Sequence, residues 1–146
     1  MRVDFYQYRN SLDSLLAALC EKALSAGRIL IKTKTLERSQ YINSLLWTYN
    51  PSSFLPHGTK QDGHAEHQPI FITHLDKDVP NGAKIYLSVD GDFLSDATPF
   101  DRIIYFINGH DEETIFQAKK ELNRLRQTET NIFYHEQTDN GKWEER

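Results

Sequence analysis

The chain has 146 residues, which is close to the roughly 150 residues of a typical domain, and we expect one domain over residues 1–146. Lys and Arg number 17 against 21 Asp and Glu, so the formal charge is −4, whereas proteins that bind nucleic acid across a broad face are usually basic. Strong direct binding to nucleic acid is therefore disfavoured. The longest apolar run, residues 103–107, is too short to span a bilayer, so no membrane association is expected.

A strand and a helix are predicted at the start of the chain. Residues 2–8 are rich in aromatic and β-branched types, which is typical of a strand. From Leu12 to Leu24 the apolar residues follow helical spacing, with Asn10 as the expected N-cap and Gly27 as the expected left-handed residue after the helix. This pattern places the single cysteine, Cys20, on the buried face. We therefore expect an inert thiol, no disulfide and a reducing, cytoplasmic setting.

A second strand and helix follow, and then a long loop. Residues 29–31 form a short apolar run that predicts a buried strand. Thr35 is the expected cap of the second helix, and Pro51 is expected to end it. Residues 56–69 are predicted to be a polar loop that contains Gly58, Gly63 and three histidines.

The second half of the chain repeats the alternation of strands and helices. Asp111 is the expected cap of a third helix whose apolar stripe faces inward. Trp143 closes a charged tail. The remaining strands are expected at residues 70–72, 85–89, 103–107 and 132–134, and the inward stripe of the third helix consists of Ile115, Ala118, Leu122 and Leu125.

This order predicts an α/β fold with a mixed, partly parallel central sheet flanked by helices. In nucleotide-binding proteins of this kind, glycines in the first strand-to-helix turn let the backbone approach the phosphates. Here that turn, residues 8–11 (YRNS), has no glycine. We therefore expect a nucleotide-binding-like topology without a phosphate loop, and no cofactor.

Two groups of residues raise the possibility of metal chemistry. Asp90 and Asp92 follow a predicted strand, and with His57 they define an alternative function, a Mg²⁺-dependent nuclease or phosphatase. His64 and His67 have a spacing that would allow them to share an ion. For both groups we favour the simpler interpretation, a turn and a solvated loop, and we predict no catalytic residue and no metal site.

Two other features indicate binding surfaces. Trp47 and Phe54 stand near prolines at the end of the second helix, and such aromatic residues are usual anchors of protein interfaces, although they could equally fill the core. Basic residues crowd the later half of the third helix. Basic residues at that position also complement the helix dipole, but their functional interpretation is a cationic groove for a short acidic peptide. These basic residues are Lys119, Lys120, Arg124 and Arg126.

Several segments resemble the chi subunit of bacterial DNA polymerase III, in matching order over nearly the whole chain. The most specific is SFLPH at residues 53–57, which follows LLW at residues 45–47. The others are GRILI at residues 27–31, QPIFI at residues 68–72, FDR at residues 100–102 and GKW at residues 141–143.

The resemblance implies a non-enzymatic accessory subunit of the clamp-loader assembly. It implies two protein partners, the acidic C-terminal tail of single-stranded-DNA-binding protein and a psi-type subunit. The tail site falls on Ile107, as an apolar wall, and on the cationic third helix. The residues implied for the tail are Ile107, Lys119, Lys120, Asn123, Arg124 and Arg126, and those for psi or another partner are Trp47, Phe54, Pro56 and His57.

This chain departs from the family pattern in the third helix. Glu121 and Asn123 stand where the resemblance implies basic residues, and Lys119 stands in the place of an arginine that would bind a carboxylate through two donors. We therefore expect a weaker tail site, or one that relies on Lys120, Arg124 or Arg126 instead. A further alternative to polymerase tethering is an adaptor for a helicase or repair factor through Trp47 and Phe54.

Overall fold

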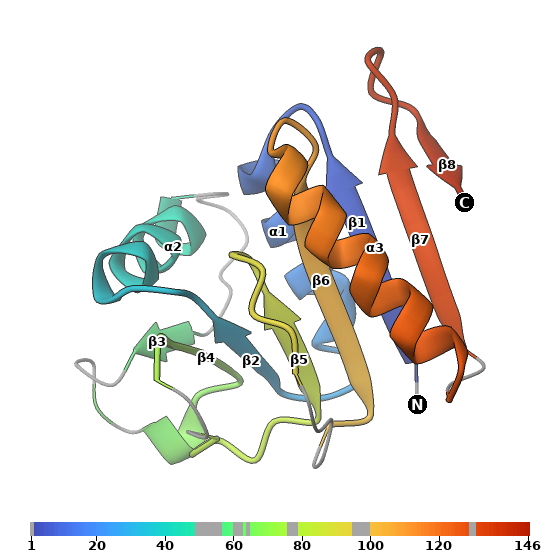
Figure 1. Ribbon diagram of the computed structural model, residues 1–146. Helices are drawn as coiled ribbons and strands as arrows, with labels where there is room; N and C mark the ends of the chain where they lie inside the picture. Colours follow the sequence, from blue (N-terminus) through green and yellow to red (C-terminus); the bar gives the residue numbers. More distant parts are fainter. Residues whose placement is uncertain are drawn as a thin grey trace.

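The computed structural model describes residues 2–48, 57–59, 63, 65–75, 79–94, 100–128 and 131–146. Its helices lie on both faces of an eight-stranded sheet with the order β3-β4-β2-β5-β6-β1-β7-β8 (Figure 1). The strands are β1 (Arg2–Tyr8), β2 (Ile29–Lys32), β3 (His57–Thr59), β4 (Ile70–Thr73), β5 (Ile85–Ser88), β6 (Arg102–Asn108), β7 (Ile132–Gln137) and β8 (Trp143–Glu145). The helices are α1 (Leu12–Ala23), α2 (Leu36–Thr48), α3 (Glu112–Arg126) and the short 3₁₀ helix η2 (Ala65–His67).

Among the described strands, all neighbours pair in parallel except β7 and β8. This arrangement confirms the predicted α/β fold with a mixed sheet. Strands β2, β4 and β5 are buried at every residue, which explains why their sequences are apolar runs rather than alternating patterns. The topology therefore requires cover on both faces of the sheet.

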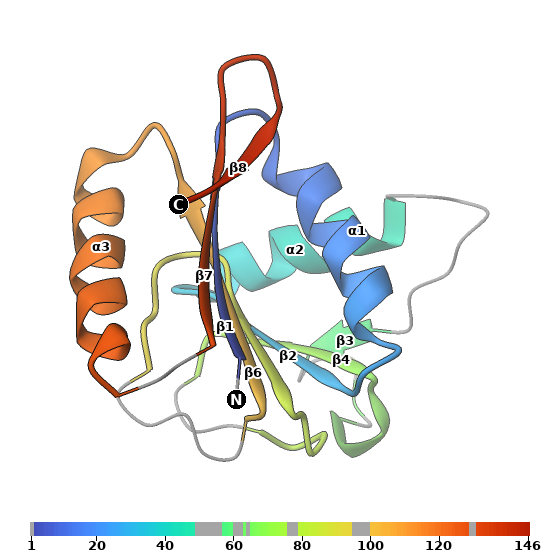
Figure 2. The same ribbon diagram turned by 90° about the vertical axis from the view of Figure 1, so that its right-hand side faces the viewer.

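Two hydrophobic layers provide that cover. Leu16 of α1 and Ile42 of α2 belong to one buried cluster, on the face of the sheet that these helices cover. Phe5, Tyr105 and Leu122 belong to a second cluster on the opposite face, beneath α3. Figure 2 shows α1 and α2 on one side of the sheet and α3 on the other. Burial of each large side chain contributes about 1.5–3 kcal/mol to folding.

Helix α1 has the predicted buried stripe but different ends. Ser11 is its N-cap, because Ser11 Oγ accepts a hydrogen bond from the Asp13 amide at 3.2 Å, so the prediction of Asn10 was wrong by one residue. The helix ends at Ala23 with Leu24 as its C-cap, so Gly27 lies too far along the chain to provide the predicted cap. Cys20 is fully buried, and this burial raises the pKa of its thiol to about 12.

The caps predicted for the other two helices are confirmed. Thr35 Oγ1 accepts a hydrogen bond from the Arg38 amide at 3.1 Å, at the start of α2. Asp111 Oδ1 accepts from the amides of Glu113 and Thr114 at 3.1 and 3.3 Å, at the start of α3. Within the described ranges, no helix has the length and apolar character needed to cross a membrane.

Two short strands were not predicted. β3 lies inside the expected polar loop and forms the edge of the sheet next to β4. β8 turns the expected charged tail into a hairpin with β7, closed by a 2.7 Å hydrogen bond from the Thr138 amide to the Lys142 carbonyl oxygen. Gly141 follows Asn140 in this turn and has a φ of 85°. Asn-Gly is a strong hairpin signal, so this dipeptide was the available sign of β8.

The buried carboxylate of Asp4 joins three neighbouring strands, β6, β1 and β7. Asp4 of β1 is fully buried, and its oxygens lie 2.9 Å from Arg2 Nε, 3.4 Å from Arg102 Nη2 and 3.0 Å from His135 Nε2. Burial alone would raise the pKa of Asp4, but hydrogen bonds from Arg2 and His135 outweigh it, so the pKa lies below its usual value. The ionised form is therefore the one that stabilises the fold.

We predict that Asp4→Asn lowers the free energy of unfolding by about 3 kcal/mol near neutral pH, because it leaves the cations around position 4 without their buried counter-charge. A group with a lowered pKa in the folded state stabilises above its unfolded pKa and loses that effect as pH falls through the folded value. The difference between wild type and variant should therefore shrink below about pH 4 in urea unfolding curves. Asp139→Asn, at an exposed ion pair with Arg9, is the control, and an equal loss there would contradict the role of Asp4.

Candidate functional site

A hollow of about 460 Å³ lies between α3 and the β7–β8 hairpin. Its charged side chains are three cations and one acid, and two larger residues, Leu122 and Tyr134, provide its apolar part. The lining residues are Lys119, Leu122, Asn123, Arg126, Tyr134, Glu136 and Arg146. The hollow is therefore more basic than a chain with a formal charge of −4 would suggest.

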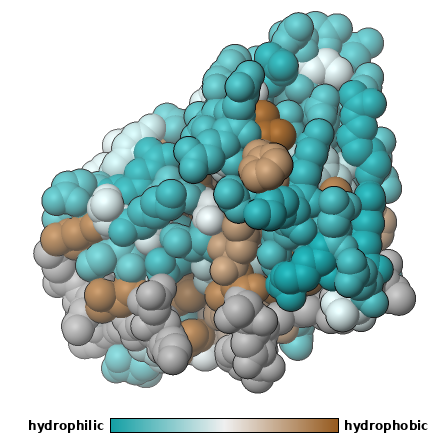
Figure 3. Space-filling model, in the orientation of Figure 1, coloured by the Kyte–Doolittle hydropathy of each residue, from teal (hydrophilic) through white to brown (hydrophobic). Residues whose placement is uncertain are grey.

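The helix places three of the predicted residues in this hollow. Lys119, Asn123 and Arg126 are separated by four and three positions, which puts them on one face of α3. The adjacent apolar stripe of α3, with Ala118, Leu122 and Leu125 buried, packs on the sheet and holds the helix in place. Figure 3 shows the α3 side of the molecule, where hydrophilic residues surround small apolar areas.

The apolar part of the hollow differs from the prediction. Ile107 is fully buried in the layer beneath α3 and is not among the residues that line the hollow. Leu122 and Tyr134 line the hollow instead. The Tyr134 hydroxyl donates a hydrogen bond to Gln7, and burial, with a smaller effect from the Glu136 carboxylate, raises the pKa of Tyr134 to about 12. The phenol therefore stays neutral at physiological pH.

The other two predicted cations point elsewhere. Lys120 Nζ lies 5.3 Å from the ring centroid of Phe116, which is an exposed residue. Arg124 pairs with Glu121 through Nε at 3.1 Å, and its Nη2 donates to the Leu94 carbonyl oxygen at 3.3 Å. The basic residues of α3 thus divide into two groups, and only Lys119 and Arg126 line the hollow.

Arg146 and Glu136 are members of the hollow that the sequence analysis missed. Arg146 Nη2 lies 3.2 Å from Glu136 Oε2 and 3.0 Å from Glu144 Oε2. The Arg146 amide also donates to the Tyr134 carbonyl oxygen at 2.8 Å, which fixes the chain beside β7. Recognising the Asn140-Gly141 turn would have folded residues 143–146 back onto β7 and brought Arg146 to this position.

Trp47 forms a separate exposed aromatic surface at the end of α2. Its side chain is 53% exposed, so it lies on the surface rather than in the core. Its ring centroid is 4.7 Å from that of His57, which is buried and has Nε2 at 3.1 Å from the Asn43 carbonyl oxygen. Phe54 and Pro56, the other predicted members of this surface, lie outside the described residues.

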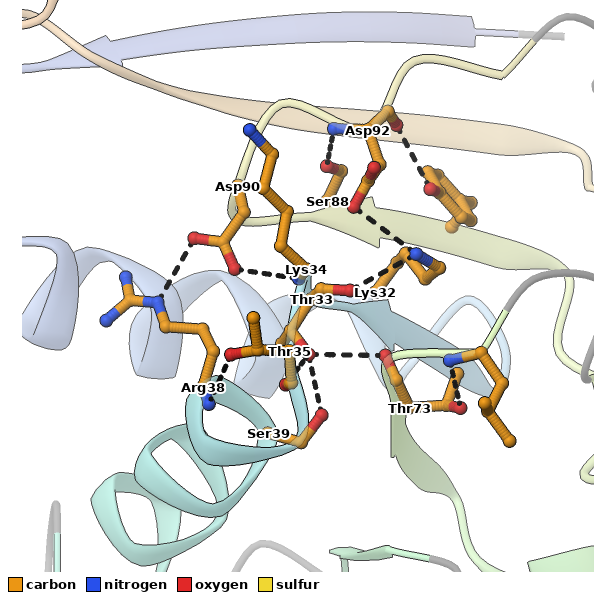
Figure 4. A network of polar contacts seen from close by, with 12 residues as sticks. Lys32, Thr33, Lys34, Thr35, Arg38, Ser39, Thr73, Ser88, Asp90 and Asp92 are labelled. Carbon is orange, nitrogen blue, oxygen red and sulfur yellow. Dashed lines mark hydrogen bonds and ion pairs between the residues drawn. The ribbon is translucent and has the colours of Figure 1, made fainter.

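The two aspartates of the alternative metal hypothesis are held by the protein's own donors (Figure 4). Asp90 accepts from the Lys34 amide and from Arg38 Nε, both at 3.1 Å. Asp92 Oδ2 lies 3.3 Å from Lys32 Nζ, a nearly buried ammonium. A divalent cation would have to displace these cationic partners, so the arrangement favours the structural interpretation of both carboxylates.

The histidines of the predicted loop are also separated. His57 is buried against α2, and His67 lies beside Glu66 at 3.6 Å. His64 lies outside the described residues. Within the part of the chain that the structure describes, no three His, Cys, Asp or Glu side chains are grouped so that they could hold a metal ion.

The first strand-to-helix turn is closed by a side chain from β7. Gln137 Oε1 accepts hydrogen bonds from the amides of Arg9 and Asn10 at 2.8 and 3.1 Å. In nucleotide-binding proteins of similar topology, amides at this turn bind phosphate oxygens. Here a neutral amide side chain satisfies these donors, in agreement with the predicted lack of a phosphate loop.

A second, larger hollow of about 670 Å³ lies on the opposite face, between α1 and the hairpin. Leu15, Leu19 and Trp143 give it an apolar lining, and its Glu21 and Lys22 have opposite charges. It therefore lacks the excess of cations that an acidic ligand requires, and the α3 hollow is the better candidate for such a ligand.

The fold is thus an α/β fold of nucleotide-binding-like topology with its first turn closed and a basic hollow at one edge. The family model of the DNA polymerase III chi subunit, HolC, matches residues 1–132, and the chain belongs to this family. A curated relative, the probable DNA polymerase III subunit chi of Rickettsia prowazekii (strain Madrid E), is 33% identical over 89 residues. That match covers 58% of this chain and 53% of the relative, so the chain spans about half of the relative's length. The chi resemblance seen in the sequence is confirmed.

We predict that millimolar Mg²⁺ or EDTA leaves the thermal unfolding midpoint of the protein unchanged, because protein cations already neutralise Asp90 and Asp92. Arg38→Ala should lower the free energy of unfolding by about 0.5–1 kcal/mol, the range for a partly exposed ion pair. Scanning calorimetry measures both effects. A Mg²⁺-dependent rise in the midpoint that Asp90→Asn abolishes would favour the metal hypothesis instead.

Proposed function

We propose that this chi-family chain is a non-catalytic subunit that tethers DNA polymerase III to single-stranded-DNA-binding protein. It does so by binding the acidic C-terminal tail of that protein in the hollow between α3 and β7. The observation that carries the proposal is the combination of Lys119, Arg126 and Arg146 with an apolar floor in one small concave site.

The chemistry of the hollow matches a peptide that is acidic and ends in an aromatic residue. Ammonium and guanidinium groups provide charge-assisted hydrogen bonds to carboxylates, including a free terminal carboxylate. Leu122 and Tyr134 offer an apolar contact for the aromatic ring. A site of this size fits micromolar affinity, about −8 kcal/mol, and several tails on one oligomeric partner raise the effective concentration.

A second surface serves the connection to the polymerase. We place a psi-type subunit, and through it the clamp loader, on the exposed Trp47 with His57 beneath it. An exposed tryptophan supported by a second ring is a typical interface anchor. Because α2 and α3 lie on opposite faces of the sheet (Figure 2), the two partners are able to bind together. A cytoplasmic location follows from this role, and a helicase or repair factor is the alternative occupant of the Trp47 surface.

Lys119→Ala should weaken binding of a synthetic acidic tail peptide by about 1–3 kcal/mol, which is about 5-fold to 150-fold. The loss arises because the lysine lines the hollow, whereas Lys120 lies over Phe116. Lys120→Ala is therefore the matched control and should retain most of the affinity. Isothermal titration calorimetry at low salt measures both, and binding should weaken as salt screens the partly exposed charges.

Two results would contradict the tail site. If the wild-type protein does not bind the peptide at low salt, the proposed function is ruled out. Equal losses in the Lys119 and Lys120 variants would show that the general charge of α3, rather than the hollow, attracts the peptide.

Trp47→Ala should abolish co-purification with a psi-type subunit while leaving the affinity for the tail peptide unchanged, because Trp47 lies on the other face of the sheet from the hollow. Size-exclusion chromatography of the purified pair and peptide titration measure the two properties separately. Tyr41→Ala, which alters another exposed aromatic residue of α2, is the control. A psi complex that survives Trp47→Ala would favour the helicase or repair adaptor as the partner of this surface.

A further inference from the structure

Glu136 is the single acid among the described residues that line the α3 hollow. It lies on β7 two residues after Tyr134, and side chains two apart on a strand point to the same face. Its carboxylate is therefore directed to the same side of the sheet as α3, where the proposed ligand would place its own carboxylates. A negative charge at this position opposes an anionic peptide.

The Glu136 carboxylate also forms an ion pair with one cation of the hollow, Arg146. Glu136 Oε2 lies 3.2 Å from Arg146 Nη2, and the side chain of Glu136 is only 27% exposed. A pair with one partly buried member is less screened by water than a fully exposed pair. Part of the positive charge of the hollow is thus already neutralised from within the chain.

Arg146 has a second partner that keeps it in place. Its Nη2 lies 3.0 Å from Glu144 Oε2, and its amide donates to the Tyr134 carbonyl oxygen. Glu144 is about half exposed and does not line the hollow. Loss of the Glu136 charge would therefore leave Arg146 anchored beside the hollow by Glu144, with one carboxylate fewer around its guanidinium.

Resting on the proposed function, we propose that Glu136 is an internal competitor of the acidic peptide and sets the specificity of the hollow. A ligand carboxylate replaces Glu136 at Arg146, and the displaced Glu136 turns toward solvent. Peptides with several carboxylates, including a free terminal one, gain enough from Lys119, Arg126 and Arg146 to achieve this exchange. Peptides with one weak anionic group do not.

The test compares four full-length proteins: wild type, Glu136→Gln, Asp139→Asn and Arg146→Gln. Each is titrated calorimetrically with a synthetic acidic peptide that ends in an aromatic residue with a free carboxylate, and with the same peptide amidated at its end. Glu136→Gln should bind the free-carboxylate peptide about threefold to tenfold more tightly than wild type, because a like charge is removed from the hollow. This gain in affinity over wild type should become smaller as the salt concentration rises.

The other variants separate the inference from a general charge effect. Asp139→Asn removes the same charge outside the hollow, at an exposed ion pair with Arg9, and should change affinity less than twofold, while Arg146→Gln should weaken binding. The Glu136→Gln substitution should raise the affinity for the amidated peptide less than it raises the affinity for the free-carboxylate peptide. Glutamine has nearly the shape of glutamate, and Glu136→Ala provides a second variant should the first fail to fold.

The outcomes distinguish this inference from the proposed function. Wild type that binds, with Glu136→Gln equal to it or weaker, overturns the internal competitor and leaves the tail site standing. Equal gains in the Glu136 and Asp139 variants likewise overturn it, since net charge alone would then explain them. If neither wild type nor Glu136→Gln binds the peptide, both the tail site and the competitor fail.

Discussion

A parallel sheet leaves its strands with no solvent-facing side in the middle of the molecule, and this constraint organises the rest of the structure. Strands β2, β4 and β5 are buried at every residue, so helices must cover both faces. Helix α3 runs from β6 to β7 across β1 and covers one face. Its flank next to the β7–β8 hairpin borders the concave, cation-rich hollow.

Charge distribution, rather than total charge, distinguishes this surface. The chain is acidic overall, yet its acids are largely used by the fold: Asp4 joins β1 to its neighbours, while Asp90 and Asp92 hold Arg38 and Lys32. Basic residues in the late turns of α3 are favoured by the helix dipole and need no such partners. A modest basic site can therefore exist on an acidic protein without loss of stability.

Local signals in the sequence predicted most of the fold. The spacing of apolar residues in α1 and the capping roles of Thr35 and Asp111 depend on residues within one helical turn, and they were correct. The predicted cap of α1 was wrong by one position because Asn10 and Ser11 are both residue types that favour the N-cap, and composition alone does not choose between them. β8 was missed because three residues, two of them charged, carry no strand pattern.

Only part of the candidate site was predictable from the sequence, because local signals specify the spacing along a helix but not which elements pack against it. Helical spacing brought Lys119 and Arg126 together, but the division between Lys119 and Lys120 depends on which face of α3 meets the hairpin. Ile107 was expected at an open notch, whereas α3 packs over β6 and encloses it. Arg146 enters the hollow through the β7–β8 hairpin, whose one local sign is the Asn140-Gly141 turn.

Gln137 has a consequence for how the protein is made. The amides of Arg9 and Asn10 at the end of β1 receive their hydrogen-bond acceptor from a residue 128 and 127 positions later in the chain. Both sheet neighbours of β1, strands β6 and β7, also come from the C-terminal third. Strand β1 therefore waits, without partners on either side, until β6 and β7 have been synthesised. Such long-range closure slows folding, and it makes the synthesis of β7 the step that allows the nascent protein to complete the sheet around β1.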